Sequence, residues 1–196
     1  MWPTAVVPTM GASSRAEAPT VEVSRQGAAA LDSELATEAR GLVEDFAKRL
    51  KGALETAIKD GGPTAAVEVC NEEAPQIADA LSTETGWAVA RTSLKHRNPA
   101  NAPDDWERGV LQAFETRQAD GEEAKGMTFT ANVSEADGRQ FRFMQAIPTA
   151  QVCLVCHGSA VPDDVASAID ELYPGDLARG YEAGEIRGAF SLVKPL

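Results

Sequence analysis

The residues of this chain best suited to chemistry form one short motif, C-L-V-C-H, at residues 153–157. Its C-x-x-C-H spacing is typical of haem attachment, in which two thiols add to the haem vinyl groups and the adjacent imidazole ligates the iron. Two intervening residues let one helical turn place both sulfurs along the porphyrin edge, and Gly158 lets the chain turn away from the ring. The motif therefore predicts one covalently attached haem c, held by Cys153, Cys156 and His157.

Two other kinds of site use part of this motif. A disulfide or thioredoxin-like redox pair needs both cysteines but not His157, and the βαβ pattern expected beside such a pair is not evident. A structural zinc site needs four ligands, and the candidates are Cys70, Cys153, Cys156 and one of His96 or His157. Zinc sites more often combine two C-x-x-C motifs, and the neighbouring residues Cys156 and His157 are poorly placed to bind the same ion. The sequence favours haem, with zinc as the alternative.

The opposite face of a haem iron takes a second side chain, water or substrate. The candidate side chains are Cys70, His96, Met127, Met144 and Met10. Met144 alternates with Phe143, so we expect it to face away from the side that Phe141 and Phe143 share. His96 beside a loop is also typical of a solvated surface imidazole, and Cys70 of a buried structural cysteine. The residues alone leave the sixth ligand open.

Two helices are expected before the motif. Apolar residues recur at helical spacing from Leu31 to about residue 58, with Asp32 or Ser33 as the cap and the glycines at 61–62 as the end. Pro63 suits the first turn of a second helix, which Pro75 is expected to kink. In that helix Cys70 falls on the apolar face.

The rest of the chain mixes strands and helices. We expect a strand at 87–91, a Pro- and Asn-rich loop at 97–103, a helix with Trp106 on its apolar face, and a hairpin of strands at 127–133 and 141–147. A short helix at 165–172 and a last strand at 186–193 follow the motif. This order predicts an α+β fold, an antiparallel sheet with flanking helices and a long N-terminal helical section.

Composition excludes several kinds of partner. The net charge of −12 argues against nucleic acid and anionic membranes, because phosphate contacts need clustered lysine and arginine. No stretch approaches the roughly 18 apolar residues that span a bilayer. Residues 1–30 are expected to be a leader or disordered segment, since 16–18 resemble a signal-peptidase site without a basic region before them. Residues 31–196 are expected to form one domain.

Four segments in order resemble one family, the PAS-like c-type haem domains, which includes a cyanobacterial cytochrome and extracytoplasmic input regions of sensor kinases. They are residues 64–75, 91–104, 153–158 and 180–190. The resemblance implies a PAS-like sheet and a haem ligated by His157 and Cys70. His96 stands where the family has small or aliphatic residues.

The resemblance also indicates a function. A Cys70 thiolate would stabilise ferric iron and lower the reduction potential, and a six-coordinate iron disfavours catalysis, so we expect no enzyme activity. We expect a low-potential haem used for redox sensing or signalling, with a diffusible electron carrier and a gas-binding haem protein as alternatives. The location is expected to be extracytoplasmic, the periplasm or a thylakoid lumen, with an unidentified redox or signalling protein as partner.

Five further residues are candidates for the haem pocket. Lys95 and Arg97 are suited to pairing with haem propionates, with a solvated cationic loop as the alternative. The side chains of Phe141, Phe143 and Ile147 are suited to walling the porphyrin, with plain core packing as the alternative.

Overall fold

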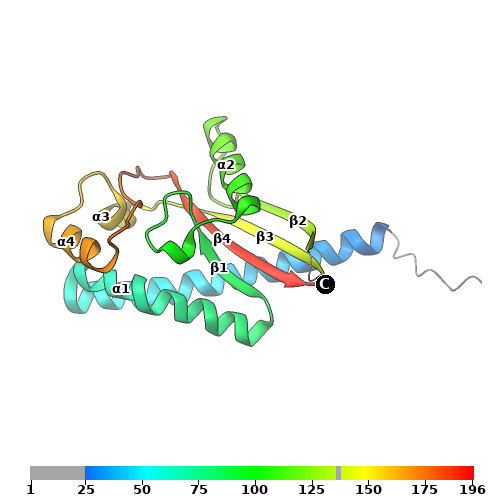
Figure 1. Ribbon diagram of the computed structural model, residues 1–196, viewed down its shortest axis with the longest axis horizontal. Helices are drawn as coiled ribbons and strands as arrows, with labels where there is room; N and C mark the ends of the chain where they lie inside the picture. The colour runs from blue at the N-terminus through cyan, green and yellow to red at the C-terminus, as the bar shows by residue number, and fades with distance from the viewer. Residues whose placement is uncertain (1–24, 136–137) are drawn as a thin grey trace, which may run out of the picture.

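The computed structural model describes residues 25–135 and 138–196. Helices lie on both sides of an antiparallel sheet, so the predicted α+β class is confirmed (Figure 1). With η denoting 3-10 helices, the elements in chain order are α1 (Arg25–Thr85), β1 (Ala88–Thr92), η1 (Pro99–Asn101), α2 (Asp105–Ala119), β2 (Thr128–Glu135), β3 (Gly138–Pro148), η2 (Gln151–Cys153), α3 (Leu154–His157), α4 (Asp163–Leu172) and β4 (Ile186–Pro195).

The α1 segment is a helical hairpin whose two arms run in opposite directions (Figure 1). Gly62 separates the arms with φ 77° and ψ −175°, and a positive φ of this kind is readily adopted only by glycine. The predicted break at residues 61–62 is therefore confirmed, with Pro63 opening the second arm. The dihedral angles stay helical through Pro75, so the proline does not break that arm.

The first arm begins earlier than the sequence predicts. It starts at Arg25, and Asp32 and Ser33 lie inside the helix, so the predicted cap is wrong. Leu31 is 46% exposed. The alanine-rich stretch before it has a high helix propensity but no periodic apolar residues from which the sequence could predict a helix. The boundary predicted at residues 30–31 falls within the helix, and the rest of the predicted leader, 1–24, lies outside the described residues.

The sheet has the strand order β1-β4-β3-β2, and all neighbouring strands are antiparallel. The predicted hairpin is confirmed as β2 and β3, with Thr128 opposite Gln145. The last strand, β4, lies between β1 and β3 and is buried on both faces, as Ala189 and Phe190 show. A central strand covered on both faces explains why the C-terminal segment carries so few charges.

A separate hydrophobic core lies on each face of the sheet. The helical hairpin α1 covers one face, where the buried side chains include Phe46, Leu81, Trp87, Phe141, Phe143, Phe190 and Leu192. Helix α2 covers the other face, where they include Val110, Leu111, Phe114, Met127, Met144 and Ala189. The alternation of side chains along β3 and β4 sends neighbouring residues into different cores.

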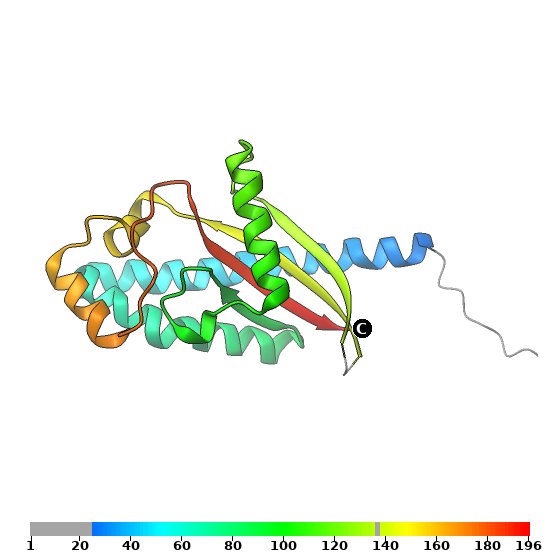
Figure 2. The ribbon, with the colours of Figure 1, turned by 45° about the horizontal axis from the view of Figure 1, so that its top comes forward.

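The segments that carry the predicted motif lie at one end of the molecule, beside the turn of the α1 hairpin (Figure 2). A third cluster of buried side chains, made of Val67, Val165, Ile169 and Tyr173, joins the second arm of α1 to α4, and Cys156 packs against it. This cluster fixes the motif against the arm that carries Cys70. In the part of the chain that the structure describes, no helix is long and apolar enough to cross a membrane.

Candidate functional site

The C-x-x-C-H motif folds as consecutive helical turns. η2 ends at Cys153, and α3 runs from Leu154 to His157. The Gly158 N–H closes the turn by donating to the Leu154 carbonyl at 2.9 Å. Glycine is required there, because a Cβ on Gly158 would lie 2.6 Å from the same carbonyl oxygen. The helical turn that the spacing predicts is therefore present, with both cysteines and His157 half-buried.

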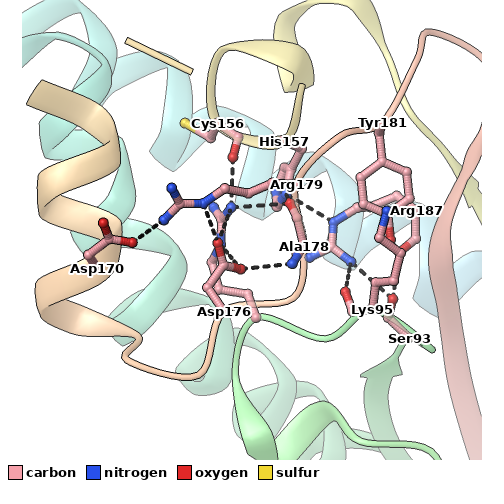
Figure 3. Close-up of polar contacts among 11 residues, drawn as sticks. Ser93, Lys95, Cys156, His157, Asp170, Asp176, Ala178, Arg179, Tyr181 and Arg187 are labelled. Carbon is pink, nitrogen blue, oxygen red and sulfur yellow. Dashed lines mark hydrogen bonds and ion pairs between the residues drawn. The ribbon is translucent and has the colours of Figure 1, made fainter. Parts of the chain in front are cut away.

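The imidazole of His157 is held through one of its two nitrogens. Its Nδ1 lies 2.8 Å from the carbonyl oxygen of Ala178, and the ring of Tyr181 meets it edge-on with centroids 6.4 Å apart (Figure 3). The backbone also joins these segments, since the Tyr181 N–H donates to the His157 carbonyl at 2.9 Å. An Nδ1–H that donates to a carbonyl leaves the Nε2 lone pair free for a metal.

The environment keeps this imidazole neutral. Burial lowers the pKa of His157 to about 3, and the positive charges of Arg187 and Arg97 act in the same direction. The hydrogen bond to Ala178 and the negative charge of Asp176 raise the pKa but are outweighed. At neutral pH the ring therefore carries no charge, which is the form that binds metals.

The buried side chain of Arg97 forms hydrogen bonds with the motif and with the segment around Asp176 and Ala178. Its guanidinium donates to the Cys156 carbonyl at 2.6 Å, to the Asp176 carboxylate at 2.9 Å and to the Ala178 carbonyl at 3.3 Å. The residue is only 6% exposed, so the solvated loop that we considered as its alternative role is wrong. Arg97 instead joins the motif to the segment that holds His157.

Asp176 is the acceptor at the centre of these contacts. Its carboxylate accepts hydrogen bonds from the guanidinium of Arg97, from that of Arg179 at 2.8 Å, and from the Ala178 N–H at 2.9 Å. Burial raises the pKa of Asp176, but these hydrogen bonds outweigh the effect and hold the pKa below its ordinary value. Arg179 also pairs with Asp170 on α4, which extends the network to the surface.

Cys70 lies on the second arm of α1, which packs through Val67 on the same apolar cluster as Cys156. Burial raises the pKa of Cys70, while the positive charges of Arg91, Arg97 and Arg187 lower it and Cys153 raises it. The pKa of Cys156 is likewise raised by burial first and by Cys70 and Cys153 in addition. All three cysteines are half-buried free thiols, and Cys153 contributes to the pKa of both of the others.

The two methionines of the described residues that we considered as ligands lie elsewhere. Met127 and Met144 are 2% and 0% exposed in the core beneath α2, where they pack on apolar side chains. Met144 does face away from Phe141 and Phe143, as predicted, since those rings lie in the core beneath α1. Met10 lies outside the described residues.

The predicted pocket residues separate into two groups. Phe141 and Phe143 are 1% and 0% exposed in the core beneath α1, so core packing is their role there, and Ile147 packs at the margin of the same core. Lys95, in contrast, lies close to the motif, with its Nζ 4.3 Å from the centroid of the Tyr181 ring. A role for Lys95 or Ile147 at a haem stays a prediction.

His96 is half-buried rather than fully solvated. Its carbonyl accepts the Leu177 N–H at 3.1 Å, and its Nδ1 is buried without a hydrogen-bond partner in the part of the chain that the structure describes. The same described residues hold no group of three or more His, Cys, Asp or Glu side chains arranged for a metal ion. The zinc alternative therefore gains no support from the geometry.

The sequence did not single out four residues of this site: Asp176, Ala178, Tyr181 and Arg187. Ala178 acts through its backbone carbonyl, which leaves no signal in the residue type. Tyr181 and Arg187 lie in the last of the four segments that resemble the haem domain family, and that segment was the available signal. Asp176 follows a Tyr-Pro-Gly turn and carries no motif of its own.

Comparison with known proteins identifies one family and one fold. The Tll0287-like family model, described as Tll0287, matches residues 14–195. A solved structure, the crystal structure of the cyanobacterial heme-protein Tll0287, has a TM-score of 0.63 and 24% sequence identity, and the match covers 83% of this chain and 95% of that one. At this identity the likeness shows the fold. No curated protein sequence matches.

The ion pair between Arg97 and Asp176 makes a prediction about stability. Asp176→Asn leaves a buried arginine unpaired, so we expect a loss of about 3–5 kcal/mol in the free energy of unfolding. Because the pKa of Asp176 is lowered in the folded state, the contribution is complete above its ordinary pKa near 4 and is lost as the pH falls further. Urea unfolding at pH 7 and pH 3.5 measures both effects.

Asp170→Asn is the matched control for this prediction. Asp170 pairs with Arg179 but its side chain is 69% exposed, so its loss should change the free energy of unfolding by less than about 1 kcal/mol. Equal effects of the two substitutions, or a cost of Asp176→Asn that does not shrink at pH 3.5, would contradict a structural role of the buried pair.

Proposed function

The chain belongs to the Tll0287-like family, whose model spans most of its length, and from this premise we propose that it is a c-type haem protein with one covalently attached haem. The observation that carries the proposal is the state of His157, whose Nδ1 is engaged by the Ala178 carbonyl beside two thiols on the same helical turns. The similar structure is that of a protein named as a heme protein. Haem supplies a one-electron ferric–ferrous couple when it is bound.

The donors of this chain fit such a group. Cys153 and Cys156 offer two thiols for thioether bonds, and His157 offers a neutral Nε2 as the proximal ligand. Cys70 offers a thiol from the facing arm of α1, and we propose it as the distal ligand. Burial raises the pKa of Cys70, and the positive charges of Arg91, Arg97 and Arg187 offset part of that rise.

A His/Cys ligand pair favours a redox role over catalysis. If His157 and Cys70 both held the iron, substrate would have no site on it, and a thiolate would lower the reduction potential. We therefore propose redox sensing or signalling in a PAS-like domain, an interpretation based on the four ordered sequence segments. The proposal includes an extracytoplasmic location, because c-type haem is attached outside the cytoplasm, and a protein partner that receives the electron or the signal.

A diffusible electron carrier is the second candidate. Val152 is 65% exposed immediately before Cys153, and Leu177 is 52% exposed immediately before the carbonyl that holds His157. Exposed apolar side chains beside a redox centre suit brief docking of a partner protein. This observation supports transfer of electrons by encounter.

Covalent haem attachment is the first test. The protein made together with a cytochrome c maturation system should give the pyridine haemochrome spectrum of haem c, and the haem should resist extraction by acidified acetone. The Cys153→Ala/Cys156→Ala double variant should lose this covalent bond, whereas Cys70→Ala should keep it. A wild-type protein without a c-type haemochrome would end the proposal.

Cys70 as the distal ligand makes a separate prediction. Cys70→Ala should shift the ferric Soret band and raise the reduction potential, because the thiolate that stabilises ferric iron is removed. Glu72→Gln is the control, since it removes a negative charge from an exposed position on the same arm without removing a thiol. A spectrum and potential that match the wild type would remove Cys70 from the coordination of the iron.

Carbon monoxide separates sensing from electron carriage. In a sensor whose distal ligand leaves on reduction, carbon monoxide should bind ferrous iron and raise the measured potential, and the Cys70→Ala variant provides a positive control with an open position. A potential that does not respond to carbon monoxide in the wild type would favour the electron carrier instead. Spectroelectrochemical titration with and without the gas gives the answer.

A further inference from the structure

Arg187 occupies a fixed position beside the imidazole of His157. It lies at the beginning of β4, and its Nε is 3.2 Å from Nδ1 of His157 (Figure 3). Its Nη1 donates to the Ser93 hydroxyl at 3.1 Å and to the Lys95 carbonyl at 3.3 Å. The guanidinium also lies 5.5 Å from the centroid of the Tyr181 ring. Contacts on three sides therefore hold the charge in place.

The backbone on either side of Arg187 is equally constrained. The Ser93 hydroxyl donates to the Arg187 carbonyl at 2.8 Å. The next residue is Gly188, where a Cβ would lie 2.4 Å from the Thr92 carbonyl oxygen and 3.0 Å from the Ser93 Cβ. Only glycine permits this close approach of β4 to the end of β1. The position of Arg187 relative to His157 is thus determined by the sheet.

Two groups compete for one nitrogen of His157. The Ala178 carbonyl accepts a hydrogen bond only if Nδ1 carries the proton, whereas the Arg187 Nε–H donates to Nδ1 only if it does not. In the second arrangement the proton lies on Nε2, which blocks that nitrogen as a ligand. A neutral imidazole that offers Nε2 to iron therefore keeps the hydrogen bond to Ala178. The positive charge of Arg187 then lies against the ring, with no carboxylate paired to it in the part of the chain that the structure describes.

We propose that Arg187 is a positioning residue that raises the reduction potential of the haem iron. The inference rests on the proposed function and adds a regulation of the same site. A fixed positive charge next to the proximal ligand disfavours ferric iron, which carries one more positive charge than ferrous iron. The guanidinium also withdraws electron density from Nδ1 and weakens the donation to Ala178, which makes the imidazole a poorer ligand for ferric iron. Both effects act against the thiolate of Cys70.

The test is the midpoint potential of three purified haem-loaded variants. Arg187→Gln should shift the potential to more negative values while the ferric absorption spectrum stays that of the wild type. Arg139→Gln is the matched control, since it removes the same charge from an exposed position at the start of β3 and should leave the potential unchanged. The shift should persist at high ionic strength, because a half-buried charge in contact with the ring is poorly screened.

Arg187→Lys is the second variant. It keeps the charge but lacks the Nε–H and the planar fork that reaches Ser93 and Lys95 together, so its potential should lie between those of Arg187→Gln and the wild type. A potential as negative as that of Arg187→Gln would show that the charge does not set the potential. If Arg187→Gln does not accumulate, the uncharged Arg187→Met replaces it, and a potential identical to the wild type in that variant would overturn the proposal.

The two proposals fail in different ways. If Arg187→Gln carries covalent haem and has the same potential as Arg139→Gln, the role of Arg187 is overturned and the haem assignment stands. If the wild-type protein carries no covalent haem, the proposed function falls and the inference about Arg187 falls with it.

Discussion

The buried ion pair between Arg97 and Asp176 is the interaction on which the site depends. It joins residues 79 positions apart in the sequence, and the same guanidinium holds the Cys156 carbonyl. A charge that is 6% exposed is stable only with a partner, so the loop that carries Arg97 and the segment that carries Asp176 must meet. Their meeting places the Ala178 carbonyl against His157, and the orientation of the imidazole follows.

The electrostatics of the site differ from those of the whole protein. The chain has a net charge of −12, yet Arg91, Arg97 and Arg187 all act on Cys70 at one end of the fold. Burial is the main reason that His157 stays neutral, and the charges of Arg187 and Arg97 act in the same direction. On Cys70 the three arginines offset part of the rise in pKa that burial causes. Burial and the neighbouring charges, and not the net charge of the chain, therefore determine the ionisation state of these groups.

The hairpin of α1 is the second requirement of the arrangement. Its first arm contributes Phe46 to the core on the sheet, and its second arm carries Cys70. The reversal at Gly62 lets one helical segment do both, since the second arm returns along the sheet and packs Val67 into the cluster with α4. The reversal at Gly62 and the packing of Val67 on α4 thus place the arm that carries Cys70 on the side of the motif.

The sequence by itself determined the features that are local. Residues 153–157 specify a helical turn with two thiols and an imidazole, residues 61–63 specify the helix break, and alternation specifies the β2–β3 hairpin, because spacing and backbone preference act over a few residues. The opposite faces of Phe143 and Met144 followed from the same alternation. The predicted helix start at Leu31 was wrong because the alanine-rich stretch that precedes Leu31 in the same helix shows no apolar period.

Only the tertiary structure decided which groups surround His157. Its partners are a backbone carbonyl 21 positions away and an arginine 30 positions away, and Arg97 reaches across 59 and 79 positions to hold the same segments. The alternation of side chains along β3 does not show which face of the sheet lies near the motif. Phe141 and Phe143 were therefore candidates for the haem pocket in the sequence, and the structure places both in the core beneath α1. No local sequence pattern predicts these contacts. They form because a buried charge is stable only beside a partner, and that partner can lie far away in the sequence.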